Sequence, residues 1–158
     1  MTETRTGGCQ CGAVRFRAAT LKDNPHVCHC RMCQKATGNF FAALVGVPKE
    51  DLTWTRGQPA EFRSSESGAR GFCRDCGTPL YYSGTGNAHL SLSIAAFDDP
   101  GAIPLRFEAG YESRLPQLDQ LGGLERYRTA DWGDLEQVSL RTSCQHPDHD
   151  TDVWPDHS

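Results

Sequence analysis

The sequence lacks long apolar runs, and none of its hydrophobic stretches reaches the roughly 18 residues that a membrane-spanning helix needs. We therefore expect no membrane partner. The opening residues, MTETRTGG, also lack the apolar segment of a secretory signal, and we expect them to form a loose lead-in. A chain without such a signal is expected to stay in the cytoplasm, where thiols are kept reduced.

Positive charge is also scarce. Together 16 Lys and Arg residues against 20 Asp and Glu give a net charge of -4, which offers no electrostatic footprint for nucleic acid. With 158 residues, of which 37% are hydrophobic, the chain suits one domain with a moderate core. Its 16 glycines and 9 prolines indicate many turns and short elements, which favours a mainly β chain over a helical bundle.

Cysteine, in contrast, is abundant. The eight cysteines are Cys9, Cys11, Cys28, Cys30, Cys33, Cys73, Cys76 and Cys144. A disulfide framework is the alternative explanation, but disulfide-rich scaffolds are typically secreted and smaller. Metal binding is therefore the leading hypothesis for these thiols.

The polarity pattern predicts several short strands. Residues 13–18 (AVRFRA) alternate in polarity, which is typical of a half-buried strand with Val14 and Phe16 on one face. Arg15 and Arg17 lie on the other face. Further strands are expected over 40–47, 52–55, 60–63, 90–94 and 105–107, with turns at 64–68 and 83–87. A short helix is expected over 31–37, closed by Gly38.

The segment Cys73-Arg-Asp-Cys76-Gly77 has the spacing of a zinc knuckle. Two intervening residues let one tight turn direct both sulfurs at one metal, and the following glycine allows a positive φ. One knuckle supplies two ligands, whereas a structural zinc takes four. Cys9-Gln-Cys11 is the natural source of the other two. The two pairs predict a closed zinc site that staples the N-terminal strand to the middle of the sheet.

The segment Cys28-His-Cys30-Arg-Met-Cys33 places three thiols close together in the sequence. If Cys30 and Cys33 lie at i and i+3 on a first helical turn, with Cys28 just before it, all three can face one metal. Three cysteines leave one coordination position open, which is the arrangement of a reactive and labile zinc rather than a structural one. Water, hydroxide or a substrate thiolate could occupy that position.

Several alternatives stay open for this second cluster. His29 could complete the metal shell, although neighbours in sequence seldom converge on one metal with good geometry. Soft thiolates also suit copper(I), and two of the three cysteines could form a redox disulfide. The spacing differs from the ferredoxin run, and too few sulfurs remain for a four-cysteine iron–sulfur centre.

Other side chains near the second cluster could steer an anionic ligand, or could simply form the solvated face of a short helix. These are Arg31, Lys35, Thr37 and Asn39. Aromatic residues are expected in the core or on a sheet face rather than in a substrate site. They are Trp54, Phe62, Phe72, Tyr81 and Tyr82.

Composition changes near the C-terminal end. From Asp131 onward there are seven acidic residues and one Arg, which predicts an acidic tail over 131–158 on the surface. Within it, Cys144-Gln-His146-Pro-Asp-His149 resembles a ligand cluster. We interpret this segment as a solvated end rather than a third metal site.

Three segments, GGCQCGAVRF, CHCRMCQKATGNFF and FCRDCGTPLYY, together resemble the glutathione-dependent formaldehyde-activating (GFA) enzyme family, which also includes centromere protein V. ESRLP at 112–116 resembles the end of that domain. The resemblance covers residues 5–130, which we expect to form one zinc domain, and it matches seven of the cysteines in order. Cys144 has no counterpart in it.

The resemblance implies a β-tent fold of antiparallel sheets with few short helices. It implies one structural Zn²⁺ on the first four-cysteine set and one catalytic Zn²⁺ on the second set. The structural ligands would be Cys9, Cys11, Cys73 and Cys76, and the catalytic ones Cys28, Cys30 and Cys33. The implied activity is condensation of formaldehyde with glutathione to S-hydroxymethylglutathione, a carbon–sulfur lyase reaction when written in reverse.

Two functions therefore compete. The first is an enzyme that adds a low-molecular-weight thiol such as glutathione to formaldehyde or a related small aldehyde, with His29 and His89 as candidate bases. The second is a non-catalytic zinc module of the same fold that binds a protein partner, because fold alone does not fix function.

Overall fold

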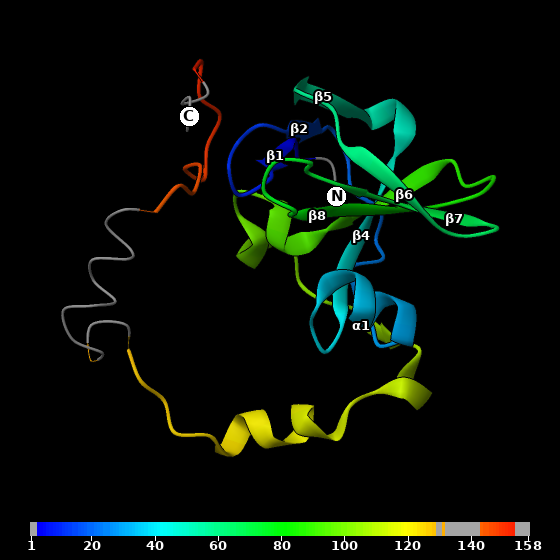
Figure 1. The fold of residues 1–158 in the computed structure, drawn as a ribbon, viewed down its shortest axis with the longest axis vertical. Helices are drawn as coiled ribbons and strands as arrows, with labels where there is room; N and C mark the ends of the chain where they lie inside the picture. Colours follow the sequence, from blue (N-terminus) through cyan, green and yellow to red (C-terminus); the bar gives the residue numbers. More distant parts are fainter. Residues whose placement is uncertain (1–2, 129–130, 132–142, 154–158) are drawn as a thin grey trace.

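The computed structural model describes residues 3–128, 131 and 143–153, and these form two β-sheets (Figure 1). The smaller sheet has the order β1 (Arg5–Gly8), β2 (Arg15–Ala18), β5 (Leu52–Arg56). The larger sheet has the order β10 (Phe107–Ala109), β3 (His26–Cys28), β4 (Ala42–Pro48), β9 (His89–Ser93), β8 (Pro79–Gly84), β7 (Gly68–Phe72), β6 (Ala60–Ser65). Strands pair antiparallel except β10 and β3, which are parallel. The expected mainly β fold is confirmed.

Helices are few and short in the described part of the chain. The helix α1 (Arg31–Thr37) spans the predicted range and ends at Gly38, whose φ is 61° and whose N–H donates to the carbonyl of Gln34. Short 3-10 helices between strands are η1 (Lys49–Asp51), η2 (Ile94–Ala96) and η3 (Pro100–Ala102). After β10 follow η4 (Tyr111–Ser113) and the longer η5 (Pro116–Gly123). None of these helices is long and apolar enough to cross a membrane.

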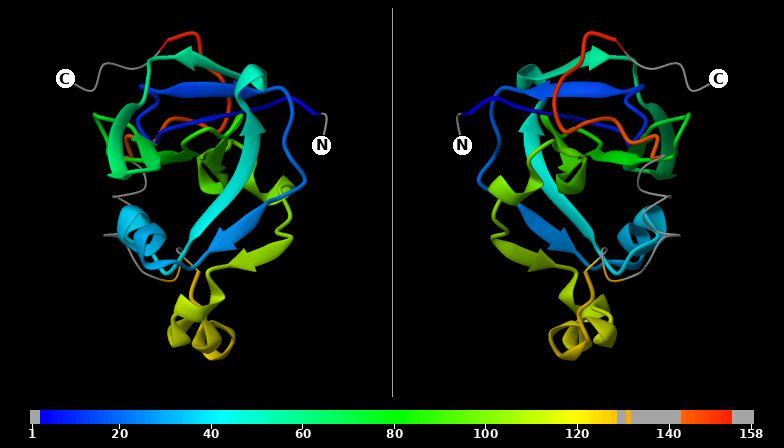
Figure 2. Two further views of the ribbon diagram at one scale, coloured as in Figure 1. Left: turned by 90° about the vertical axis from the view of Figure 1, so that its right-hand side faces the viewer. Right: turned by 90° about the vertical axis from the view of Figure 1, so that its left-hand side faces the viewer.

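The smaller sheet lies beside β8 of the larger sheet (Figure 1). The helix α1, with the adjoining parts of β3 and β10, lies away from the smaller sheet (Figure 2). The strand β4 runs between these two regions, and it carries the buried side chains of Val45 and Val47. Its apolar sequence was expected for a buried strand, because both of its faces are covered.

The core forms where the sheets meet. Phe16 of β2 is fully buried and packs edge-on against Phe97, with ring centroids 5.0 Å apart, and against Trp54 at 5.9 Å. Edge-to-face contacts of this kind add to the free energy gained by burying the rings. Cys9 and Cys73 belong to the same buried cluster. The first cysteine set is therefore built into the edge of the core.

Two expectations about the N-terminal part were wrong. The lead-in is not loose, because residues 5–8 form β1 and pair with β2, and a Cβ at Gly7 would lie 2.3 Å from the carbonyl oxygen of Ala96. Arg15 does not face solvent: its side chain is 3% exposed and pairs with Asp98 at 2.6 Å and Asp150 at 2.8 Å. Burial raises the pKa of Asp98, but the hydrogen bonds from Arg15 outweigh this and lower it below its ordinary value.

The described part of the C-terminal segment, residues 143–153, packs on the smaller sheet. His146 is 5% exposed, and its backbone N–H donates to the carbonyl of Gln10 at 2.6 Å. Its ring lies against Gly12. Arg56 of β5 donates to Nε2 of His146 at 3.3 Å and to the Thr151 carbonyl. The interpretation of this stretch as a solvated end is therefore wrong for His146. Residues 132–142 and 154–158 of the predicted acidic tail lie outside the described residues.

Replacing His146 with Ala should lower the free energy of unfolding by about 1–2 kcal/mol, because Arg56 loses an acceptor and Gly12 loses its cover. Chemical denaturation of the zinc-loaded protein measures this. His149→Ala is the matched control, because His149 is exposed only three residues away, and it should leave the stability unchanged. Equal stability of the two variants would contradict the docking of this segment.

Candidate metal centres and the adjoining cavity

The first cysteine set comes from two turns at the ends of strands. Cys9 and Cys11 follow β1, and Cys73 and Cys76 follow β7. Their four Sγ atoms lie within 4.8 Å of one another, with 3.6 Å between Cys9 and Cys11 and 3.8 Å between Cys11 and Cys73. A tetrahedral zinc with Zn–S bonds of about 2.3 Å separates its sulfurs by about 3.8 Å. The four thiols therefore fit one zinc ion.

Backbone and hydroxyl groups lie within hydrogen-bonding distance of two of these sulfurs. The N–H of Val14 donates to Sγ of Cys9 at 3.2 Å, and the hydroxyl of Thr78 lies 3.1 Å from Sγ of Cys76. Burial raises the pKa of Cys76, but hydrogen bonds from Thr78 outweigh it and lower the pKa to about 6. Gly12 and Gly77 both have a φ of 78°, as the predicted tight turns require.

The second cysteine set lies where β3 leads into α1. Cys28 ends β3, Cys30 is the N-cap residue of α1, and Cys33 lies in its first turn. Their three Sγ atoms lie within 4.8 Å of one another. The expected arrangement at i and i+3 is therefore observed. Within the described residues, no His, Asp or Glu side chain joins these three sulfurs.

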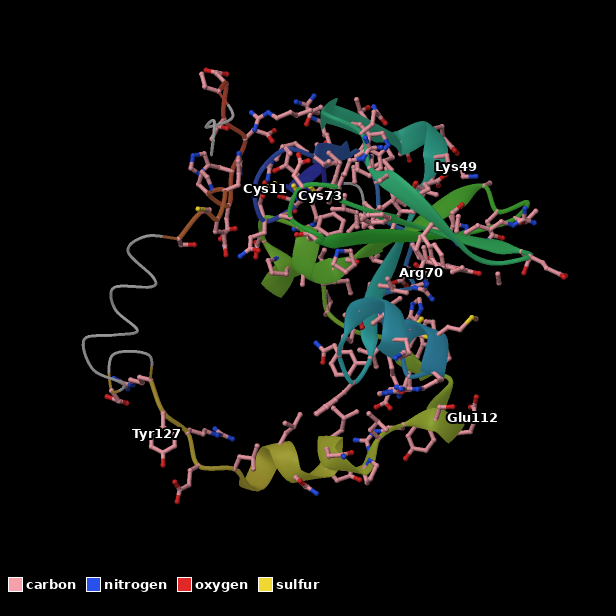
Figure 3. All side chains as sticks on the ribbon, viewed as in Figure 1. Cys11, Lys49, Arg70, Cys73, Glu112 and Tyr127 are labelled. Carbon is pink, nitrogen blue, oxygen red and sulfur yellow. The ribbon has the colours of Figure 1, made fainter. Side chains whose placement is uncertain are left out.

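Arg70 of β7 faces the second set, with Nη2 at 3.5 Å from Sγ of Cys33 (Figure 3). Burial raises the pKa of Cys28 to about 12. Burial also raises the pKa of Cys30. The backbone hydrogen bond from Cys33, the hydrogen bonds of the neighbouring thiols and the charge of Arg70 outweigh burial, so the pKa of Cys30 lies below its ordinary value. The protein thus supplies one guanidinium to balance negative charge on this set.

The side chain of His29 is not part of the group formed by the three sulfurs. Its ring is buried, with Nε2 at 3.1 Å from Oε2 of Glu108 and an edge contact to Phe41 at a centroid distance of 5.8 Å. The backbone N–H of His29 donates to the carbonyl of Ala109 on β10. The hypothesis that His29 completes the metal shell gains no support, because the side chain serves the junction between β3 and β10.

A second connection holds the loop around Cys30 in place. The buried side chain of Gln34 donates to the carbonyls of His29 at 2.8 Å and Ser113 at 2.9 Å. Gly110 has a φ of 63°, and a Cβ there would lie 2.9 Å from the nitrogen of Cys30. The segment that begins at Gly110 therefore packs directly against the second set and fixes its backbone.

A cavity of about 380 Å³ lies between α1 and the strands β6, β7 and β8. Its walls are mainly apolar and aromatic: Met32, Leu44, Phe62, Phe72, Tyr81 and Tyr82. The three cysteines do not line it; they adjoin it through Arg70 and through Leu44, which packs against Cys33. Four of the five aromatic residues expected in the core or on a sheet face lie on these strands and line the cavity, and Tyr81 also packs against the core. Trp54 packs against Phe16 as expected.

The polar candidates near the second set divide between two environments. Lys35 and Thr37 line the cavity, whereas Arg31 donates to Gln34 on its own helix, and Asn39 accepts from the N–H of Phe40. His89 lies at the start of β9, outside the cavity lining. Cys144 is exposed and belongs to neither sulfur set of the described residues.

Three residues of these centres had no signal in the sequence. Thr78 follows the CxxCG turn, and nothing in the sequence indicates that its hydroxyl forms a hydrogen bond with the sulfur of Cys76. Gln34 reads as an ordinary helix residue, and Arg70 as an ordinary strand residue. Thr78 acts locally, two residues from Cys76, whereas Arg70 lies 37 residues from Cys33 and Gln34 lies 79 residues from Ser113, so only the pairing of elements reveals the last two.

Comparison with known proteins gives three findings. The family model described as glutathione-dependent formaldehyde-activating enzyme matches residues 4–112. An uncharacterized lyase of Schizosaccharomyces pombe is 29% identical over 103 residues, which are 65% of this chain and 74% of that protein. A crystal structure of a Rhodobacter sphaeroides protein matches with a TM-score of 0.55 at 21% identity, covering 66% of this chain and 99% of that chain. The last likeness shows a shared fold alone.

Replacing Cys76 with Ser should remove one zinc per chain and lower the free energy of unfolding by several kcal/mol, because zinc binding at such a site is coupled to folding. Metal analysis and denaturation of the purified protein measure both effects. Cys144→Ser is the control, since that thiol is exposed and outside both sets, and it should change neither quantity. A Cys76→Ser protein with full stability would contradict the stapling role.

Proposed function

The chain belongs to the glutathione-dependent formaldehyde-activating enzyme family, and on that premise we propose that it is a zinc-dependent carbon–sulfur lyase of this type. In the synthetic direction it adds a low-molecular-weight thiol, such as glutathione, to formaldehyde or a related small aldehyde. The similarity to a protein named as a lyase supports the reaction class. We place the protein in the cytoplasm, a reducing compartment in which cysteines stay available as metal ligands.

The observation that carries this proposal is the contrast between the two sulfur sets. The first has four sulfurs and can saturate a tetrahedral metal, whereas the second has three. The second also adjoins a cavity large enough for a small molecule. A closed structural site needs no cavity, so the second set is the one suited to chemistry.

The donor chemistry of both sets fits zinc, since each offers closely spaced thiolates and a nearby hydrogen-bond donor or cation. When bound at Cys28, Cys30 and Cys33, zinc supplies the means to keep a thiol deprotonated at neutral pH and to polarise a carbonyl. Three thiolates give that site a net negative charge, and the guanidinium of Arg70 reduces it.

The reaction itself is a simple addition. One S–C bond forms between the thiol sulfur and the aldehyde carbon, the C=O double bond becomes a single bond, and the thiol proton ends on that oxygen. Arg70 is placed to stabilise the negative charge that passes from sulfur to oxygen. Gln34 and Gly110 hold the backbone of the cluster still, which keeps its geometry fixed during the transfer.

The proposed roles are assigned as follows. Cys9, Cys11, Cys73 and Cys76 hold a structural zinc, and Cys28, Cys30 and Cys33 form the catalytic site. His29 is not assigned as a base, because its Nε2 faces Glu108. His89 is not assigned either, because it lies outside the cavity lining.

Replacing Cys30 with Ser should give a folded protein with about one zinc fewer and no enzymatic activity. Serine is a favoured N-cap residue, so α1 should still begin at this position. Circular dichroism, metal analysis and the rate of S-hydroxymethyl adduct formation measure the three properties. The rate must be compared with the spontaneous addition under the same conditions.

Cys144→Ser is the control here too, and it should keep both zinc ions and the full rate. Equal zinc content in the wild type and Cys30→Ser would contradict a metal site at the second set. A wild type that binds two zinc ions without accelerating any thiol–aldehyde addition would indicate a zinc-dependent binding module instead.

A further inference from the structure

The cavity beside the second sulfur set is larger than formaldehyde requires, and its lining is less polar than glutathione would need. Formaldehyde has two heavy atoms, whereas about 380 Å³ lies within the range of sites for much larger ligands. Glutathione carries two carboxylates and an ammonium group but no large apolar group. Neither molecule has a large apolar group that would pack against the aromatic side chains of the cavity.

Two of the apolar side chains that line the cavity are largely exposed to solvent. Phe62 on β6 is 62% exposed and Met32 on α1 is 53% exposed, and both line the cavity. Large apolar side chains that gather at a cavity on a protein surface indicate a binding site for apolar matter. A ring placed between α1 and β6 would cover both side chains.

The charges that line the cavity have one sign. Lys35 and Arg70 are its charged lining residues, and within the described chain neither forms an ion pair with a carboxylate. Arg70 stacks over Tyr82 at 5.1 Å from the ring centroid, and its Nη2 lies 3.5 Å from Sγ of Cys33, so its guanidinium contacts both a wall of the cavity and the second set. The cavity therefore offers an apolar body with positive charge at its rim.

We propose that this cavity binds the body of the thiol substrate, and that this thiol carries an apolar, ring-sized group and one carboxylate. Its sulfur lies at the Cys28, Cys30 and Cys33 cluster, its apolar group lies between Phe62 and Met32, and its carboxylate faces Lys35. The assignment rests on the proposed function, since it assumes that the thiol reacts at this cluster. It replaces glutathione with a thiol of different chemistry.

The test measures binding of three thiols to the full-length protein loaded with cobalt(II), whose absorption changes when a further sulfur binds. The probes are 4-(mercaptomethyl)benzoate, mercaptoacetate and glutathione. The first should bind about tenfold more tightly than the other two, because only its ring covers apolar surface in the cavity. The same order is expected for kcat/KM with formaldehyde.

Phe62→Ala should weaken binding of 4-(mercaptomethyl)benzoate about fivefold and leave mercaptoacetate within about twofold. Phe107→Ala is the matched control, because Phe107 is 49% exposed on β10, outside the cavity lining. Lys35→Gln should weaken 4-(mercaptomethyl)benzoate but not phenylmethanethiol, which lacks the carboxylate. Lys49→Gln on η1 controls for the lost surface charge.

Two negative results would be distinguishable. If glutathione binds as tightly as the aromatic thiol, or if Phe62→Ala affects every thiol equally, the assignment of this cavity is overturned while the proposed reaction stands. If no thiol changes the cobalt spectrum of a protein with both sites loaded, the proposed function fails and the assignment with it.

Discussion

The sulfurs of Cys11 and Cys73 lie 3.8 Å apart although 62 positions separate them in the sequence, and the fold depends on this closure. It joins the turn after β1 to the turn after β7, and so joins the smaller sheet to the larger one. A zinc ion bound by these four cysteines, as proposed above, would supply free energy for such a contact in addition to the modest core. Cys9 and Cys73 are buried in that core, so the metal site and the apolar packing reinforce each other.

The second sulfur set uses the rigidity that this closure provides. Its three cysteines lie on a strand end and a short helix, which hydrogen bonds from Gln34 fix to the segment beyond β10. Arg70 reaches the set from β7, the strand that leads into Cys73. The strand β7 therefore serves both sets. It contains Arg70, which contacts the second set, and it leads into Cys73 of the first set. The cavity lies between α1 and the strands β6, β7 and β8.

Sequence reasoning succeeded where the chemistry is local. The CxC, CxxC and C-x-C-x-x-C spacings identified two cysteine pairs and a triplet, because neighbouring residues supply sulfurs to one turn. The four ligands of a structural metal then joined the two pairs across the sequence. Sequence reasoning failed where distant partners are not linked by such a ligand count. Arg15 was placed on a solvent face because Asp98 and Asp150, 83 and 135 residues away, cannot be paired with it in advance. Phe62 and Tyr82 were assigned to a sheet face, and alternation along a strand does not reveal that α1 leaves a cavity above that face.

The central claim is that one metal is saturated by protein sulfur and the other is not. Anomalous scattering at the zinc absorption edge, measured on crystals of the zinc-loaded protein, tests it most directly. The account predicts two zinc positions, one about 2.3 Å from four sulfurs and the other about 2.3 Å from three sulfurs and one lighter atom. A single zinc position, or a second position with a fourth protein ligand, would contradict it.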